Sequence, residues 1–432
     1  MSEPPLERTV SEQDFAALLR GSAEPFLSTC AAPGGSAWTK RRFFDLAADA
    51  DELESFLDDY GARTNRTFSA FTELVASVRG FALAGIRLAH LTRRIDAYGV
   101  LGRLGDGGKV ARRDLETALE FVEDRIVELM GAILEEARRL RVTELSRGEG
   151  RRPVERFEGW HRLPHDVDLP RLDDDDHLVA GVATRYIEAV DMMREVGIRV
   201  IEEPEQREGF FRERCSEELA RVREATVHNL QSSYDTYVKN TVLETGDPRL
   251  PELRGHISAA LHTLEAVTLL THFVERHERG LRSDAADSVL QRIVPRRSVR
   301  DVTLNRLLVC ALAFMEAGAP LAEALLPSYT TASEAKLELR DNILLHARPA
   351  SLIVAIVQHH GTPVELEVAG ARCNAGSILE LMVAIGSNPE AREFVVRGDE
   401  RPLRDLVALF AADLGESGLE VLPDSLGYLR GR

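Results

Sequence analysis

The hydrophobic positions along most of the chain repeat with a helical period. Between residues 65 and 96, apolar side chains such as Phe68, Phe71 and Leu74 follow one another at spacings of three and four. This spacing lines one face of an α-helix. The same pattern predicts further long helices over 113–141, 173–196, 209–244 and 253–279. We therefore expect an elongated antiparallel helical bundle over residues 44–326.

Glycine and proline interrupt this helical pattern at a few places. The stretch YGVLGRLGDGGK (98–109) predicts a turn between two helices, and residues 146–170 should be irregular because they contain several prolines. TGDPRLP (245–251) predicts another loop. Residues 1–43 are expected to be loosely structured, since AAPGGSA (31–37) has the composition of a flexible connector.

The period changes beyond residue 326. Alternation of apolar and polar residues, or a short apolar run, predicts strands in KLELRDN (336–342), PVELEVA (363–369) and EFVVRG (393–398). Helical spacing predicts helices over 347–358, 377–385 and 401–413. The resulting order, β-α-β-β-α-β-α, predicts a compact α+β domain.

These patterns together predict a multidomain chain. A large all-α helical bundle is followed by a small α+β domain at 336–416, with a linker at 327–335 and a C-terminal tail at 417–432. A length of 432 residues fits two or three domains, because single cores stop growing at about 250–300 residues.

Composition limits the classes of function. The formal net charge of −17 argues against a general nucleic-acid binder, which needs a basic face for phosphates. The N-terminus lacks the pattern of a signal peptide, and the longest uninterrupted apolar run, LLVCALAFM (307–315), falls far short of the ~20 residues of a membrane span. The four cysteines are scattered without metal or redox spacing. We expect a cytoplasmic protein without a membrane partner, a nucleic-acid partner or a cofactor.

The stretch ILLHARPA (343–350) carries the clearest candidate chemistry. The predicted strand ends here and a helix begins at Ala347, with Pro349 in the first turn, where a missing N–H costs little. His346 then lies at or beside the N-cap, where free backbone N–H groups form an anion site. Arg348 adds a guanidinium suited to phosphate oxygens. The arrangement predicts a reversibly phosphorylated histidine; alternatively, His346 only caps the helix and Arg348 lies on the surface.

Two motifs in this region resemble a known family. NILLHARPASLIVAIV, followed by NAGSILELM, by a Gly-Asp after the last strand and by a closing helix, resembles HPr, the histidine-containing phosphocarrier of the bacterial phosphotransferase system. The resemblance covers about Lys336 to Glu416 and implies an HPr-like open-faced β-sandwich. It also implies that His346 accepts a phosphoryl group from phospho-Enzyme I and passes it on, with Arg348 neutralising the phosphate.

The second motif implies regulation and docking. Ser377 precedes an apolar run and reads as a helix N-cap. The resemblance implies that a kinase of the HPr kinase type phosphorylates this serine and thereby blocks partners. It further implies that Leu352, Leu379 and Met382 form an apolar docking patch; core packing is the alternative for these three side chains.

Departures from the family keep a second function open. The family usually has glycine where Leu344 stands, often lysine where Gly376 stands, and a small or neutral residue where Glu380 stands. Our first hypothesis is a phosphoryl carrier, not a conventional enzyme, fused to a helical output or dimerisation module whose acceptor is unknown. The alternative is a regulatory docking protein that Ser377 phosphorylation switches, or that is not phosphorylated at all.

The helical region offers weaker candidates. His262, Glu265 and His272 have helical spacing and could hold a metal in a metal-dependent enzyme, although polar or partly buried histidines fit the pattern better and we predict no metal site. GRLGDGGK (102–109) lacks the spacing of a phosphate loop and predicts a plain turn. The basic stretch RRSVRDVTLNR (296–306) predicts a solvated helix face, with an acidic partner or a phosphoryl group as the alternative.

Overall fold

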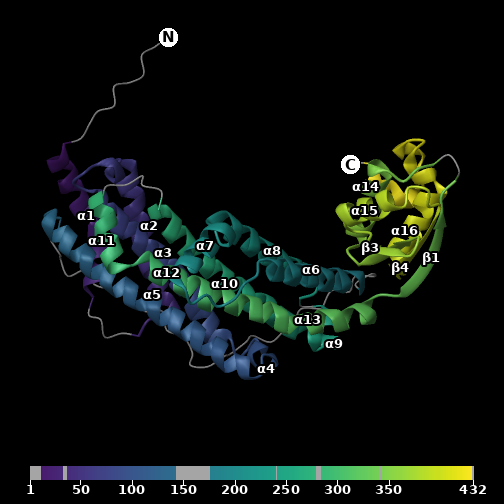
Figure 1. Cartoon of the computed structure of the whole chain (residues 1–432). Helices are drawn as coiled ribbons and strands as arrows, with labels where there is room; N and C mark the ends of the chain where they lie inside the picture. Colours follow the sequence, from purple (N-terminus) through teal and green to yellow (C-terminus); the bar gives the residue numbers. More distant parts are fainter. Residues whose placement is uncertain are drawn as a thin grey trace, which may run out of the picture. The chain divides into compact units, whose positions relative to one another are not determined.

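The computed structural model describes residues 11–32, 37–142, 176–239, 241–278, 284–340 and 343–430. Long helices dominate this part of the chain up to residue 329 (Figure 1). The helices of this region are α1 (Glu12–Ala31), α2 (Lys40–Asp59), α3 (Ser69–Arg94), α4 (Val100–Arg103), α5 (Asp106–Arg139), α6 (Asp176–Glu195), α7 (Pro204–Arg214), α8 (Glu217–Tyr237), α9 (Val242–Gly246), α10 (Arg249–Glu278), α11 (Asp284–Ile293), α12 (Arg296–Asp301) and α13 (Val309–Tyr329).

Strands occur among the described residues only after α13. The elements that follow are β1 (Ala332–Glu338), α14 (Ala347–His360), β2 (Val364–Val368), β3 (Ala371–Asn374), α15 (Ile378–Ser387), β4 (Glu393–Asp399) and α16 (Glu400–Ala411). Short 3₁₀ turns lie at Ala62–Thr64, Asp413–Gly415, Leu419–Val421 and Asp424–Leu429, and a π-helical segment, Val302–Leu308, joins α12 to α13.

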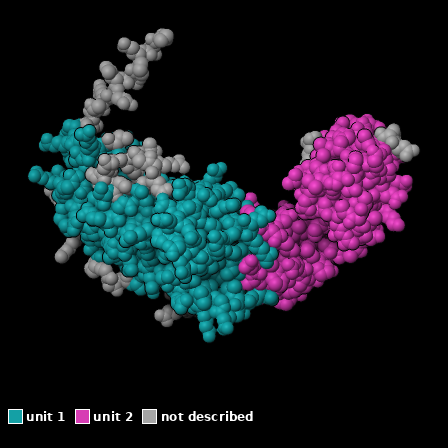
Figure 2. Space-filling view, in the orientation of Figure 1, with its two compact units in different colours: residues 1–167, 193–228, 255–315 teal, residues 168–192, 229–254, 316–432 magenta. Residues whose placement is uncertain are grey.

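Two compact units divide the chain (Figure 2). Unit 1 comprises residues 1–167, 193–228 and 255–315, and unit 2 comprises residues 168–192, 229–254 and 316–432. Each unit therefore collects segments that are far apart in the sequence.

In unit 1, α3 is the central helix and packs against α2, α5 and α11. It is buried on most of its circumference, which explains why its sequence is so uniformly apolar. Gly85 allows the close approach of α2, because a methyl group at this position would collide with the ring of Phe43. Phe81 packs edge-on against Phe273 of α10, with ring centroids 5.0 Å apart.

A charged cluster lies within this helical packing. Glu54 of α2 is only 6% exposed, and its carboxylate accepts hydrogen bonds from Arg79 at 2.6 Å and from Arg63 at 3.0 Å. Arg276 of α10 lies 3.4 Å from the same carboxylate. Arg63 also donates to the buried Glu73 at 2.8 Å. Burial raises the pKa of Glu54, but the charges and hydrogen bonds of Arg79, Arg276 and Arg63 outweigh burial and hold that pKa below its usual value.

In unit 2, the strands form one antiparallel sheet with the order β1-β4-β2-β3. Leu366 of β2 faces Val396 of β4 in the register, and both are buried. The alternate positions, Glu365 and Glu367, lie on the opposite face, where Arg397 forms ion pairs with both. The sheet thus buries one face and carries charges on the other, as the period of two along a strand requires.

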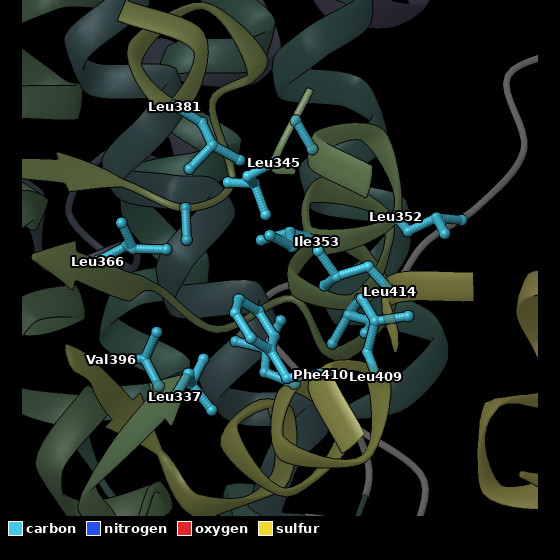
Figure 3. Close-up of a cluster of buried hydrophobic side chains, with 14 of the residues drawn as sticks. Leu337, Leu345, Leu352, Ile353, Leu366, Leu381, Val396, Leu409, Phe410 and Leu414 are labelled. Atoms are coloured by element: carbon cyan, nitrogen blue, oxygen red, sulfur yellow. The ribbon is translucent and has the colours of Figure 1, made fainter. Parts of the chain in front are cut away.

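The buried face of the sheet packs on the helices α14, α15 and α16 (Figure 1). Figure 3 shows the resulting core, in which Ile353 of α14, Leu381 of α15, Phe410 of α16 and the strand residues Leu366 and Val396 belong to one cluster. Gly361 follows the last residue of α14 and has a φ of 66°. This left-handed conformation at a helix C-terminus favours glycine. The core fixes the orientation of the residues that precede α14 and α15.

The predicted fold class was wrong. Helices make up 76% of the described residues, and the sheet found among them is a single small four-stranded antiparallel one. This does not match a large helical bundle followed by an HPr-like sandwich. The reason is that the sheet shares unit 2 with residues 176–192 of α6, the end of α8, α9 and the start of α10, which the prediction placed in the bundle.

Several boundaries also differ from the prediction. Residues 12–31, expected to be loosely structured, form α1, with Ser11 as its N-cap. The expected linker at 327–335 is divided between the end of α13 and the start of β1. The expected tail at 417–432 contributes the buried side chains Leu422, Leu426 and Leu429 to the core. The stretch 146–170 lies outside the described residues.

Three helical segments are long and apolar enough to cross a membrane, judged by length and composition alone. They are Ser69–Arg94, Arg249–Arg276 and Arg296–Tyr329, and 72%, 78% and 56% of their most apolar windows are buried inside the structure. The sequence-based expectation considered uninterrupted apolar runs only and overlooked these segments, whose few charged residues are spread among apolar ones. A cytoplasmic location therefore stays a prediction.

Candidate functional site

His346 lies at the N-cap of α14. Its backbone is extended, with φ of −128° and ψ of −171°, and its carbonyl accepts the first helical hydrogen bond from Ala350 at 3.0 Å. The imidazole Nδ1 accepts the backbone N–H of Arg348 at 3.4 Å. The side chain is 53% exposed, and Arg348 is exposed as well. The N-terminal turn of α14 therefore presents a ring nitrogen, a backbone N–H and a guanidinium on the surface.

The other ring nitrogen of His346 has an acidic partner that the sequence did not suggest. Nε2 lies 3.1 Å from Oε1 of Glu416. In this pairing Nε2–H donates to the carboxylate, which leaves the lone pair of Nδ1 directed at the first turn of α14. The two contacts thus select one tautomer and orient the ring.

A left-handed turn carries Glu416 to this position. Asp413, Leu414 and Gly415 have φ values of 52°, 54° and 73°. A positive φ is unfavourable for Asp and Leu, and the cost is offset here because Leu414 is buried in the core and Asp413 accepts a hydrogen bond from Arg340 at 2.8 Å. The turn packs against α14, so its conformation and the position of Glu416 depend on the core.

Ser377 is the N-cap of α15, as predicted. Its hydroxyl accepts the backbone N–H of Glu380 at 3.4 Å, and the side chain of Glu380 reaches back to the N–H of Asn374 at 3.0 Å. Asn374 in turn accepts the N–H of Gly376 at 2.8 Å. These bonds resemble a capping box in which Glu380 accepts the N–H of Asn374, three residues before the N-cap, and they account for Glu380 as a structural side chain.

The structure separates the three predicted docking residues. Leu379 is 73% exposed, Met382 is partly buried against the core, and Leu352 is only 8% exposed. Leu352 faces the backbone of Gly415 and supports the turn that carries Glu416. Its assignment to a docking patch was wrong, because its face of α14 is covered by this turn.

Other apolar side chains are exposed instead. Ile378 and Val383, at 44% and 61% exposure, lie with Leu379 on α15, and Leu344 is exposed two residues before His346. We call Ile378, Leu379 and Val383 the α15 patch. Val383 could have been found from the sequence, because it lies four residues after Leu379 and therefore on the same face of the helix.

A second cluster of polar side chains lies at the opposite end of α14. His360 and Tyr428 both contact one carboxylate oxygen of Asp405, at 2.8 and 2.7 Å. The ring of His359 stacks on that of Tyr428, with centroids 3.7 Å apart. Burial raises the pKa of Tyr428, and the hydrogen bond to Asp405 raises it further. These contacts fasten the C-terminal 3₁₀ turn to α14 and α16.

We expect Tyr428→Phe to destabilise unit 2 by about 1–2 kcal/mol, because Asp405 loses a hydrogen bond to a charged group. Hydrogen exchange of peptides from α14 and α16 in urea measures the change. Tyr237→Phe, at an exposed tyrosine of the same unit, is the control and should have no effect. Equal exchange in both variants would show that the cluster is not stabilising.

The three residues weighed as metal ligands in unit 1 do not form one site. His262 contacts Glu265 at 2.7 Å, whereas His272 contacts Glu217 of α8 at 2.8 Å. Within the part of the chain that the structure describes, no three His, Cys, Asp or Glu side chains gather as metal ligands. His262 also packs edge-on against His90, whose pKa is lowered to about 4, first by burial and then by the charges of His262 and Lys40.

Two further stretches were weighed as ligand sites from the sequence, and both form parts of helices or the turn between them. The glycine-rich stretch 102–109 contains the end of α4 and the start of α5, which confirms a turn between helices. The basic stretch 296–306 forms α12 and most of the π-helical segment.

Comparisons with protein-family models, with curated proteins and with solved structures found no match for this chain.

Proposed function

We propose that the chain is a phosphoryl carrier in a phosphotransferase-type relay and that His346 is the residue that holds the phosphoryl group. The observation that carries the proposal is the pair of contacts on the imidazole, Glu416 at Nε2 and the backbone N–H of Arg348 at Nδ1. The imidazole is half-exposed, and its contacts place the proton on Nε2 and the lone pair on Nδ1. The ring is therefore oriented for nucleophilic attack through Nδ1.

The chemistry follows from this geometry. The lone pair of Nδ1 attacks the phosphorus of a donor phosphoryl group, so that an N–P bond forms while the bond from phosphorus to the donor breaks and its electron pair stays with the donor. The Nε2 proton stays on the ring, and the carboxylate of Glu416 stabilises the positive charge that develops there. The phosphoryl oxygens then take the place of Nδ1 as acceptors for the N-terminal N–H groups of α14, beside Arg348. Transfer to an acceptor reverses these steps.

A phospho-Enzyme I-like protein is the proposed donor, and the proposed setting is the cytoplasm. The helical segments would supply the output or a dimerisation surface. A second candidate function is a regulatory docking protein, and the exposed α15 patch beside Ser377 favours it. A phosphate on Ser377 would add negative charge next to Glu380 and to that patch, which would repel an acidic or apolar partner.

We expect the full chain to gain an acid-labile phosphate on incubation with phosphoenolpyruvate and Enzyme I from the same organism, measured by intact mass. His346→Asn should abolish the label while keeping the helix cap, because asparagine is a good N-cap residue. His228→Ala, at an exposed histidine of α8, is the matched control and should label fully.

Two results would contradict the carrier proposal. Wild-type protein that takes up no phosphate from phospho-Enzyme I cannot be a carrier in this relay, and the docking function then takes its place. A label that persists in His346→Asn would assign the phosphate to another residue. An acid-stable phosphate at Ser377, added by a serine kinase and lost in Ser377→Ala, would support the docking function.

A further inference from the structure

An open pocket in unit 1 concentrates positive charge. Its volume is about 710 Å³, and its lining includes the guanidiniums of Arg212, Arg296, Arg297 and Arg300 against the single carboxylate of Glu208. The whole chain has a net charge of −17, so a pocket lined by four arginines is locally opposite in charge to the protein as a whole. The arginines come from α7 and α12, which are adjacent in space although about 80 residues apart in sequence.

The side chains that line this pocket are held in place by packing and ion pairs. The side chain of Arg300 is only 12% exposed, with its guanidinium 5.6 Å from the ring centroid of Phe211. The guanidinium of Arg300 lies 3.7 Å from a carboxylate oxygen of Glu208. This distance allows an ion pair but is too long for a hydrogen bond. Arg207 of α7 forms an ion pair with Asp301 of α12 at 3.1 Å, so the two walls are held together.

Further contacts fix the backbone around the pocket. The side chain of Asn305, in the π-helical segment, accepts the N–H of Ile201 at 2.8 Å and donates to its carbonyl at 2.9 Å. Arg125 of α5 donates to the carbonyl of Ile293, at the end of α11, at 2.8 Å. The segments that enter α7 and α12 are therefore anchored, which preorganises the arginines between them.

We propose that this pocket binds a small anion that carries two or more phosphate groups. Guanidinium groups match phosphate oxygens in a bidentate geometry, and four of them exceed what one phosphate can engage. A volume of about 710 Å³ lies within the range of small-molecule sites. The ligand would make the helical part of the chain a sensor for a polyphosphorylated compound, independently of the phosphoryl group proposed for His346.

The electrostatics of Arg300 agree with an anionic ligand. Burial lowers the pKa of its guanidinium, Glu208 raises it, and the neighbouring Arg212 lowers it again. Burial and the repulsion from Arg212 together outweigh the attraction of Glu208 and disfavour the charged form of Arg300. A bound phosphate would neutralise both arginines and remove this repulsion.

The test uses the full-length protein and inorganic tripolyphosphate as the probe, with inorganic phosphate for comparison, in isothermal titration calorimetry at fixed ionic strength. We expect saturable binding of one tripolyphosphate and at least tenfold weaker binding of phosphate. Arg212→Gln combined with Arg297→Gln should weaken tripolyphosphate binding at least tenfold, because both arginines are exposed pocket residues that no core contact requires. Hydrogen exchange should show protection of residues 204–214 and 291–300 on binding.

The control pair is Arg41→Gln with Arg138→Gln, at exposed arginines of the same unit that lie outside the pocket. It should bind as wild type, and so should His346→Asn, which separates this proposal from the carrier function. Unsaturable binding up to millimolar tripolyphosphate, or an equal loss in the two arginine pairs, would overturn the proposal. Binding of an acidic peptide or of single-stranded nucleic acid in preference to tripolyphosphate would do so as well and would assign the arginines to a macromolecular partner.

Discussion

We expect Glu54→Gln to lower the free energy of unfolding of unit 1 by roughly 2–4 kcal/mol. The buried carboxylate of Glu54 forms ion pairs with Arg63, Arg79 and Arg276. Replacing it by a neutral amide leaves three guanidiniums near one another with less negative charge between them. Breaking a buried ion pair by removing one partner costs about 3–5 kcal/mol. The arginines keep part of their solvent contact, which lowers the expected loss to roughly 2–4 kcal/mol.

The effect should depend on pH in a definite direction. The pKa of Glu54 in the folded protein lies below its usual value of 4.5, so the stabilisation is fully present above that value. It is lost as the pH falls through the lowered pKa, because the carboxyl then takes up a proton. The difference in stability between wild type and Glu54→Gln should therefore be constant near neutral pH and shrink below pH 4.5.

Hydrogen exchange of α2 and α3 peptides in urea measures this loss for unit 1 by itself, which matters because a chain of two units need not unfold in one step. Glu52→Gln makes the same change of charge on an exposed position of α2 and should shift the urea midpoint very little. A Glu54→Gln variant as stable as Glu52→Gln would show that solvent or other carboxylates, such as that of Glu73, compensate the arginines fully.

The helical parts of unit 1 could be predicted from hydrophobic spacing because burial follows the same period. The range 65–96 contains α3 and the range 253–279 contains most of α10. The predicted helix 209–244 is instead divided between α8 and α9, and also between α7 and α8, where Cys215 and Ser216 interrupt it. The apolar spacing continues across this point, and neither glycine nor proline marks it, so the break depends on tertiary packing.

The environment of His346 could be predicted only in its local part. The N-cap position followed from the order of strand and helix, with Pro349 in the first turn. Glu416 could not be found, because its approach depends on positive φ values at Asp413 and Leu414, and a positive φ is uncommon in residues other than glycine. Leu352 was misassigned for the same reason, since that turn covers it. The arginine pocket was equally hidden, because Arg212 and Arg300 meet only through the packing of α7 on α12.

If the carrier function holds, we expect Leu379→Ser combined with Val383→Ser to lower kcat/KM for phosphoryl transfer to His346 about 30-fold or more, mainly through KM. Both side chains are largely exposed on α15 and contribute little to the core, so the fold should be unaffected. Apolar side chains at the centre of an interface each contribute about 1–2 kcal/mol, and a 30-fold change corresponds to about 2 kcal/mol. Transfer kinetics at several donor concentrations separate KM from kcat.

Val407→Ser combined with Val421→Ser is the matched control, because these two valines are exposed elsewhere in unit 2. The control should leave both kinetic constants near the wild-type values. An equal loss in the two pairs would indicate a general effect of surface hydrophobicity and not a docking site. Unchanged transfer in the α15 pair would instead place the donor on another surface around His346, where Leu344 is the nearest large exposed apolar side chain along the chain. A loss in kcat alone would contradict docking too, because a binding surface that contacts the donor equally before and during transfer changes KM and leaves kcat intact.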